Sequence, residues 1–340
     1  MFRKSLCALA LGITALGSSA AAIATLAGSS TPALAAGTTR PASSMCGTVA
    51  SPPTYKHVVW ILEENTSYSS VVGSSKAPFI NSVIKACGVA SNYHNISHNS
   101  LDNYIGLTNG YSLTQLQPYL NDCTPSSTCE VTSGGDLFEQ AATKSGGWKA
   151  FDQSMGSACN RSDNGNYAVK HNPAVYYTDL NSGCNADDVV MGPPWNSPLL
   201  KSFSSESTAP AFSFVTPDVC HDMHGAINCF FNLEQTADSW LNTWVTKLTS
   251  TTVYKSGDTA IFIVWDEGAF GSKGEDCHLN TTDQSCHVPA IVIAPSVPAG
   301  TVVSTLLNHY SLLKTAEDML GVPELGEAAS ATSMESAFNL

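Results

Sequence analysis

The sequence predicts an α/β fold with a mainly parallel central sheet and helices on both of its faces. Short, continuously apolar runs are typical of strands buried in such a sheet, and they occur at 57–62, 209–218, 258–265 and 288–295. Segments with helical spacing alternate with them, at 77–88, 103–110, 135–148, 236–254 and 309–321. No internal repeat or linker interrupts this alternation, so we expect a single domain over residues 57–340.

Three further segments are less regular. Residues 88–95 are expected to begin another strand, and residues 148–154 form a strand or a loop. Residues 152–200 are polar and rich in turn formers, so we expect mostly irregular structure there.

Residues 1–35 have the layout of a secretory signal peptide. Two basic residues precede a long apolar stretch, and an A-x-A cleavage pattern ends at residue 35. A membrane anchor is the alternative, because residues 6–27 are nearly long enough to span a bilayer, but Ser, Gly and Thr interrupt them. We therefore expect a secreted protein with no stable membrane span and a flexible leader over residues 36–56.

The cysteines also indicate export. The chain has 11 cysteines, and ten remain once Cys7 in the signal peptide is set aside, an even number that suits loops stapled by disulfides. Three pairs are close in sequence, and two more would complete five bridges: Cys123–Cys129, Cys220–Cys229, Cys277–Cys286, Cys46–Cys87 and Cys159–Cys184. Other connectivities remain open at this point. A zinc cluster is disfavoured because no C-x-x-C occurs.

The formal net charge of −13 limits the choice of partners. A chain this acidic has no general basic surface for nucleic acid and no polybasic patch for anionic membranes. We expect no nucleic-acid partner, and we expect a monomer.

Polar side chains follow three of the predicted strands at the point where each strand ends. In chain order they are Glu64 and Asn65, then Asp222 and His224, then Asp266 and Glu267. His287 stands directly before a fourth strand. Because ligands bind at the carboxyl ends of strands in open α/β sheets, we expect these side chains to share one site.

Carboxylates that lie close together need a positive partner. No Lys or Arg lies near these segments in the sequence, and Lys273 is the closest. One divalent metal ion is therefore expected. Oxygen ligands favour Mg²⁺, Mn²⁺ or Ca²⁺, whereas added histidines would favour Zn²⁺ or Fe. Taken singly, each acidic segment could also be a solvated loop.

Ser100 is the candidate nucleophile. It stands three residues before the helix predicted at 103–110, and free backbone N–H groups at a helix N-terminus bind phosphate. An N-cap serine is the alternative interpretation. Thr66, directly after Asn65, is a second candidate nucleophile. The sequence contains no G-x-S-x-G, G-x-x-x-x-G-K-[ST] or G-x-G-x-x-G, which argues against a serine esterase and against nucleotide or dinucleotide chemistry.

Nine segments carry a family resemblance. They are, in order, HVVWILEENTSYSSVVG, KAPFINSV, SHNSLDNYIGLTNG, KHNPAVYY, PDVCHDMHG, ADSWL, FIVWDEG, HVPAIVIAP and HYSLLKTAEDMLG. Together they resemble the bacterial phosphoesterase family of the alkaline-phosphatase superfamily. That family includes secreted acid phosphatases, phospholipases C and a phosphatidylinositol-3-phosphate phosphatase. The resemblance implies an alkaline-phosphatase-like fold and a phosphate-ester, phosphoinositide or phospholipid substrate.

The resemblance also implies roles for individual residues. One metal ion would be held by Glu64, Asn65, Ser100, Asp266 and Glu267. Ser100 would form a phosphoserine intermediate, with His224 and His287 as further catalytic residues. Substrate would be bound by Asn65, His98, Asn103, His171 and Asp222.

Two departures from the family pattern concern this site. Family members often read H-P-S-x-P-N-Y, whereas this chain has Asn99 and Asp102 in place of the two prolines. His221 replaces the asparagine that often precedes D-M-H, which leaves the number and type of metal ions open.

Three functions remain open from the sequence. The first is a secreted, metal-dependent phosphomonoesterase of the acid-phosphatase type. The second is a phospholipase C-type phosphodiesterase, which would need apolar surface around its site. Side chains that could supply it are Tyr167, Val175, Tyr176, Tyr177, Met191 and Trp195. The third is a binding protein with a structural Ca²⁺ site, which would leave Ser100 and the histidines without a role.

Overall fold

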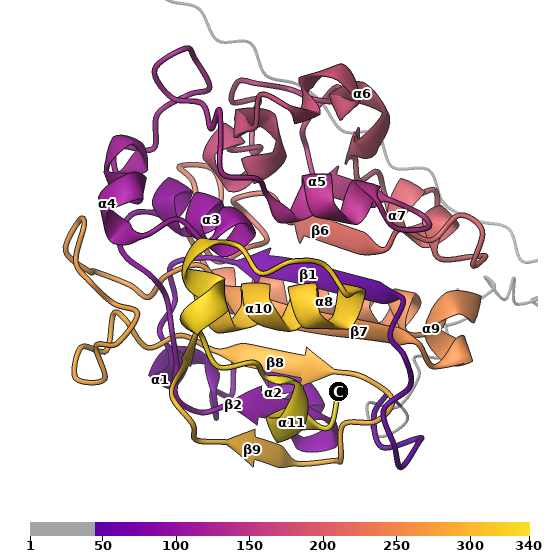
Figure 1. Ribbon diagram of the computed structural model, residues 1–340. Helices are drawn as coiled ribbons and strands as arrows, with labels where there is room; N and C mark the ends of the chain where they lie inside the picture. Colours follow the sequence, from indigo (N-terminus) through magenta and orange to yellow (C-terminus); the bar gives the residue numbers. More distant parts are fainter. Residues whose placement is uncertain (1–44) are drawn as a thin grey trace, which may run out of the picture. The chain divides into compact units, whose positions relative to one another are not determined.

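The computed structural model describes residues 45–340, so the predicted signal peptide and the first part of the predicted leader lie outside the described residues. Its centre is an eight-stranded sheet with the order β5-β4-β6-β1-β7-β8-β2-β9 (Figure 1). The strands are β1 (His57–Glu63), β2 (Gly88–Ala90), β4 (Trp148–Asp152), β5 (Asp188–Val190), β6 (Phe212–Thr216), β7 (Thr259–Trp265), β8 (Ala290–Ile293) and β9 (Thr301–Val303). A separate parallel pair is formed by β3 (Tyr93–His94) and β10 (Leu307–Asn308).

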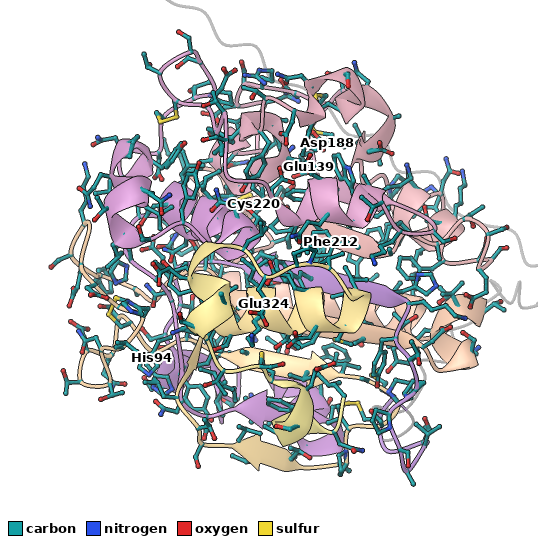
Figure 2. The ribbon with its side chains drawn as sticks, in the orientation of Figure 1. His94, Glu139, Asp188, Phe212, Cys220 and Glu324 are labelled. Carbon is teal, nitrogen blue, oxygen red and sulfur yellow. A yellow bond between two sulfur atoms is a disulfide. The ribbon has the colours of Figure 1, made fainter. Side chains whose placement is uncertain are left out.

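The middle of the sheet forms because its strands are apolar along their whole length. Every residue of β1, β6 and β7 is buried, as expected for strands that are covered on both faces. Aromatic side chains fill the space beside them: Trp60 meets Phe212 edge to face at 4.9 Å between ring centroids, and Phe212 lies inside the molecule in Figure 2. This core fixes the positions of the loops that follow β1, β6 and β7.

Helices cover both faces of the sheet. The helices α2 (Pro78–Ala86) and α8 (Leu233–Leu248) pack against each other on one face. The other face is covered by α3 (Ser100–Asn109), α5 (Leu137–Ala142) and α10 (His309–Leu320), and Figure 1 shows α10 lying across β1 and β7. The shorter helices are α1 (Tyr68–Val71), α4 (Leu113–Leu116), α6 (Cys184–Asp187), α7 (Pro198–Ser202), α9 (Thr252–Ser256) and α11 (Glu335–Phe338). Single 3₁₀ turns occupy Gln117–Tyr119, Val169–His171, Pro173–Tyr176, Leu180–Ser182 and Gly326–Ser330.

The predicted fold class is confirmed, with differences in detail. The strand predicted at 288–295 exists as β8, but it runs antiparallel to both β7 and β2. The helix predicted at 103–110 begins at Ser100, and the helix predicted at 135–148 ends at Ala142. The pattern at 236–254 forms two helices, because Thr251 caps the start of α9 by accepting a hydrogen bond from the N–H of Tyr254.

Residues 152–200 are more ordered than the sequence predicts. They include β5, α6 and α7, and much of the segment is buried. Of the six side chains suggested as an apolar surface, only Trp195 is exposed, with 85% of its surface accessible; the other five lie in the core. The prediction of irregular structure was wrong because many polar side chains of this segment form hydrogen bonds inside the protein rather than with solvent.

All five expected disulfides are present, and they include every cysteine of the described residues. The Cys46–Cys87 bond joins the predicted leader to the end of α2. The hydroxyl of Tyr254 donates to the carbonyl of Met45 at 2.6 Å, and both Met45 and Cys46 are buried. The described end of the leader is therefore attached to the domain rather than loose. Among the helices of residues 45–340, none has the length and apolar character needed to cross a bilayer.

Candidate active site

Glu64, the residue that follows β1, is the centre of a buried polar cluster. Its Oε1 accepts a hydrogen bond from the Tyr104 hydroxyl at 2.8 Å and lies 3.1 Å from Nε2 of His171. Its Oε2 accepts one from the Ser100 hydroxyl at 3.3 Å and one from the Asn65 amide at 3.0 Å. The side chain of Glu64 is fully buried, so these contacts replace its hydration.

Ser100 is the first residue of α3, and the turn before it is held by Asn103. The amide oxygen of Asn103 accepts from the N–H groups of Ile96 and Ser97, and its Nδ2 donates to the carbonyls of Ser97 and Asn99. All four bonds go to backbone. The geometry therefore gives Asn103 a positioning role and gives no support to the substrate contact expected for it.

Lys170 lies beside Ser100. Its Nζ is 3.3 Å from Ser100 Oγ and 2.9 Å from Asp122 Oδ2. Burial alone would lower the pKa of Lys170, but the carboxylates of Glu64 and Asp122 outweigh that effect and raise it, so the ammonium group keeps its charge. No lysine or arginine lies near the acidic segments in the sequence, but the fold brings Lys170 to Ser100 from 70 positions away.

Sequence reasoning missed Lys170, Asp122 and Tyr104. The available signal for the lysine was its position directly before His171 in the KHNP segment. Tyr104 also stood in a quoted segment, and its ring stacks on His171 at 5.3 Å with an interplanar angle of 7°. Nothing in the sequence around Asp122 indicates its contact with Lys170.

His171 joins Glu64 to the loop that follows β6. Its Nδ1 lies 3.3 Å from Asp222 Oδ2, and its ring meets that of His224 edge-on at 5.3 Å. Asp222 Oδ1 accepts a hydrogen bond from the backbone N–H of His224 at 2.7 Å, and the Asp222 carbonyl accepts one from the N–H of Glu64 at 2.6 Å. Burial, followed by the charge of Lys170, lowers the pKa of both histidines.

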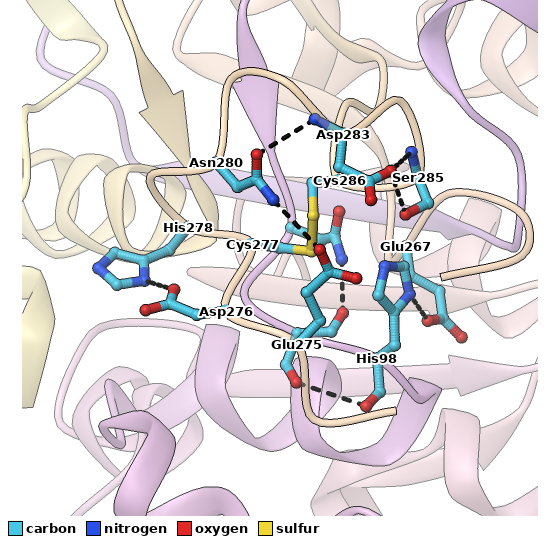
Figure 3. The surroundings of a disulfide bond; sticks show 12 residues. His98, Glu267, Glu275, Asp276, Cys277, His278, Asn280, Asp283, Ser285 and Cys286 are labelled. Atoms are coloured by element: carbon cyan, nitrogen blue, oxygen red, sulfur yellow. Dashed lines mark hydrogen bonds and ion pairs between the residues drawn. A yellow bond between two sulfur atoms is a disulfide. The ribbon is translucent and has the colours of Figure 1, made fainter. Parts of the chain in front are cut away.

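Asp266 and Glu267 follow β7, which pairs directly with β1, so they lie next to Glu64 across the sheet. Asp266 Oδ1 accepts hydrogen bonds from the N–H of Asn65 at 3.2 Å and from the N–H of Glu267 at 2.6 Å. Figure 3 shows the His98 ring and the Glu267 carboxylate pointing toward each other, and His98 Nδ1 is hydrogen-bonded to Glu267 Oε2. The Nε2 of His98 is buried without a hydrogen-bond partner.

His287 belongs to a different group of side chains. Its ring stacks on Tyr68 at 4.5 Å and on His94 at 5.4 Å, and its Nε2 lies 3.1 Å from the carbonyl oxygen of Ser91. These contacts do not include Ser100 or Glu64. A catalytic role for His287 stays a prediction, and the geometry gives it no support.

The residues of this cluster fit a divalent cation. Burial raises the pKa of Glu64, Asp222 and Asp266, and neighbouring carboxylates raise it further. Asp266 Oδ2 is buried without a hydrogen-bond partner, and Lys170 shares its charge with Asp122. The carboxylates of the cluster thus outnumber its cations, and a bound metal ion would balance this excess of negative charge.

Two donor sets overlap at Glu64. One is the predicted set of oxygen ligands. Within it, Glu64 is hydrogen-bonded to the side chains of Asn65 and Ser100, and the backbone N–H of Asn65 donates to Asp266. The other is Glu64, His171 and His224, whose ligand atoms lie within 4.8 Å of one another. Both hard and borderline ions therefore find suitable donors here.

Comparisons with known proteins identify the family of the chain. The Phosphoesterase family matches residues 73–323 of the chain. The phosphatidylinositol-3-phosphatase of Mycobacterium tuberculosis is 27% identical over 281 residues, which cover 82% of this chain and 81% of that protein. The phosphate-repressible acid phosphatase of Penicillium chrysogenum is 23% identical over 283 residues, and the match covers 79% of this chain and 59% of that longer protein.

Solved structures share the fold. A protein in the alkaline phosphatase superfamily from Vibrio parahaemolyticus superposes with a TM-score of 0.52 at 15% identity, covering 83% of this chain and 73% of that one. The C-terminal periplasmic domain of EcEptC from Escherichia coli gives a TM-score of 0.51 at 11% identity, covering 86% of this chain and 87% of that one. At these identities the likeness concerns the fold alone.

Proposed function

Because the chain belongs to the phosphoesterase family, and so is a hydrolase acting on phosphate esters, we propose that it is a metal-dependent phosphomonoesterase with Ser100 as its nucleophile. One observation carries the proposal: the Ser100 hydroxyl, at the first residue of α3, lies between the carboxylate of Glu64 and the ammonium group of Lys170. The names of the relatives, a phosphatidylinositol-3-phosphatase and acid phosphatases, support a monoester substrate.

The metal ion would be held by oxygen atoms at the ends of two adjacent strands and the start of α3. The residues that supply them are Glu64, Asn65, Ser100, Asp266 and Glu267. When bound, such an ion lowers the pKa of the serine hydroxyl and neutralises charge on the phosphoryl oxygens. The imidazoles of His171 and His224 are further donors beside this set.

The side chains account for the first half of the reaction. The Ser100 hydroxyl releases its proton toward Glu64 Oε2 as Oγ forms a bond to phosphorus and the ester P–O bond breaks. Lys170 stabilises negative charge on Oγ and on the adjacent phosphoryl oxygen. The leaving oxygen takes a proton from Nε2 of the imidazolium form of His224, because the Nδ1–H of that ring already donates to the carbonyl of Gly225. This form is populated at acid pH, since the pKa of His224 is lowered.

The second half of the reaction returns the enzyme to its starting state. Water attacks the phosphorus of phosphoserine, gives its proton to His224, and the P–Oγ bond breaks to release phosphate. Ser100 recovers its proton from Glu64. His98, held by Glu267, and His171, held between Glu64 and Asp222, border the same cluster and would contact the phosphoryl group.

The proposal also covers the location of the protein. Five disulfides suit an oxidising compartment, which supports secretion. The substrate would be the phosphate monoester of a small molecule or of a phosphoinositide, as the name of the mycobacterial relative suggests.

The test is hydrolysis of 4-nitrophenyl phosphate by the purified protein, before and after chelation and with single metals added back. The proposal expects turnover that the chelator removes and a divalent ion restores. A bis-(4-nitrophenyl) phosphate assay is run beside it, because faster cleavage of the diester would favour the phospholipase C-type alternative. Absence of turnover on both substrates with every metal would overturn the assignment.

A further inference from the structure

A groove of about 690 Å³ lies beside the loop that carries Asp222 and His224. One wall is α8, from Gln235 to Trp244, and the other is the Gly192–Pro194 turn. His221 and Asn232 also line the groove. None of the lining residues is a lysine, arginine, aspartate or glutamate, so the surface of the groove carries no fixed charge apart from the ionisable His221.

Three large apolar side chains are next in sequence to residues that line this groove. Trp195 directly follows Pro194, and Phe230 and Phe231 directly precede Asn232. Trp195, Phe230 and Phe231 have 85%, 57% and 74% of their surface exposed, and the two phenylalanine rings lie 4.1 Å apart. Side chains of this kind are normally buried, and a cluster of them on one surface indicates a contact surface.

The same loop links these side chains to the catalytic cluster. The Cys220–Cys229 disulfide closes it, with Asp222 and His224 inside and the two phenylalanines directly after. The Asn228 amide donates to Asn166 Oδ1 at 3.1 Å, which fixes the loop to a neighbouring segment. A surface that contacts Phe230 and Phe231 therefore comes close to the residues that act on phosphate.

We propose that Trp195, Phe230 and Phe231 form a docking surface for a zwitterionic lipid bilayer. The three side chains come from two separate loops, which suits insertion into a fluid interface better than a fit to one rigid protein surface. Aromatic side chains prefer the headgroup region of a bilayer. The groove has no lysine or arginine and the chain has a formal net charge of −13, so a zwitterionic bilayer of the phosphatidylcholine type suits this surface better than a strongly anionic one. The inference deepens the proposed function, because it brings the site to phosphate esters carried by lipids.

Tryptophan fluorescence gives a direct test. Of the six tryptophans, Trp195 is exposed and the other five are at least nine-tenths buried, so it reports on this surface. We expect phosphatidylcholine vesicles to shift the emission of the full protein to shorter wavelength, and we expect Trp195→Phe to remove that shift. Emission that vesicles leave unchanged would overturn the proposal.

Variants then separate docking from catalysis. The double variant Phe230→Ser/Phe231→Ser should lower vesicle binding in co-sedimentation at least about tenfold and leave 4-nitrophenyl phosphate hydrolysis within about twofold of the unmodified protein. Val302→Ser is the matched control, since Val302 is 64% exposed on β9, away from these loops. Equal losses in the control would contradict the proposal. If the double variant fails to fold, Trp195→Ser on the other loop provides the same comparison.

The remaining outcomes also discriminate. Concentration-dependent dimers that the phenylalanine variant dissociates, without vesicle binding, would assign the surface to a second copy of the chain and overturn the bilayer proposal. Vesicle binding by a protein that hydrolyses neither 4-nitrophenyl substrate would support docking while the proposed function fails. The two ideas therefore fail separately.

Discussion

The ammonium group of Lys170 lies 3.3 Å from the Ser100 hydroxyl oxygen and 2.9 Å from Asp122 Oδ2. Replacing Lys170 with Met should lower kcat by about 100-fold, because a fixed charge beside the attacking oxygen is lost. Asp122→Asn keeps the shape of the side chain but removes the ion pair with Lys170, and it should lower kcat by about tenfold. Steady-state kinetics on an aryl phosphate measure both effects, and circular dichroism confirms that the variants are folded. A Lys170→Met enzyme within twofold of the unmodified protein would contradict the assignment.

Ser100→Ala should reduce turnover by about 1,000-fold or more, because the covalent step has no acceptor. Mass spectrometry of acid-quenched reactions should find one phosphoryl group on the peptide that contains Ser100, and none in the variant. Thr66→Ala is the control, since Thr66 was the second candidate nucleophile, and it should change kcat little. Phosphate on the Thr66 peptide would reverse the two roles.

Asp266→Asn should abolish stabilisation by metal ions. Binding of an ion to the folded state raises Tm in proportion to the logarithm of ion concentration, and the loss of one buried carboxylate weakens that binding. Thermal unfolding with and without a chelator, followed by single divalent ions, measures the effect. Asp238→Asn instead changes a buried aspartate that accepts hydrogen bonds from the N–H groups of Phe79 and Ile80, and its response to metal should match the unmodified protein. An equal rise in Tm for Asp266→Asn would exclude Asp266 as a ligand.

The protein should lose stability as the pH rises from 5 to 8. Burial raises the pKa of Asp188 to about 6, and burial together with Asp188 raises that of Asp152 well above its usual range. Above pH 4 the folded chain therefore binds more protons than the unfolded chain. The stability that these two carboxyl groups contribute is fully present below their pKa in the unfolded chain, and it is lost as the pH rises through their pKa in the folded chain. For Asp188 alone the loss is at most about 3 kcal/mol.

Asp152→Asn tests the origin of this pH dependence. The amide stays neutral and donates to Asp188, so Tm should vary less between pH 5 and pH 8 than in the unmodified protein. Thermal unfolding at constant metal concentration gives the comparison. The same slope in both proteins would place the responsible groups elsewhere, for example at Glu317, whose pKa burial raises to about 8.

The sheet was predictable because strands buried on both faces are continuously apolar. The runs at 57–62 and 258–265 became β1 and β7 almost residue for residue. The direction of β8 was not predictable, since an apolar run looks the same in either orientation. The reversed direction of β8 also places His287, which precedes that strand, at the same edge of the sheet as the residues that follow β7. The ring of His287 nevertheless contacts Tyr68 and His94.

The acidic part of the site was predictable from the strand ends, whereas its basic part was not. Glu64 and Asp266 follow strands that pair, so their proximity comes from the sheet itself. Lys170 and Asp122 lie outside the sheet, and no periodicity describes the path of the segments that carry them. The role of Asn103 was hidden for another reason, because its four hydrogen bonds go to backbone groups whose positions depend on the finished turn.

The position of β1 in the sheet has a consequence for how the chain folds. Its two neighbours, β6 and β7, begin at Phe212 and Thr259, more than 150 residues further along the chain. A ribosome has therefore made three quarters of the protein before the central strand can pair on both sides. Contacts so distant in sequence form slowly, and an unpaired apolar strand can join other chains in the meantime. A chain truncated before Thr259 would lack β7, so one side of β1 would stay unpaired. Synthesis that stops early is therefore expected to yield aggregates rather than a smaller folded domain.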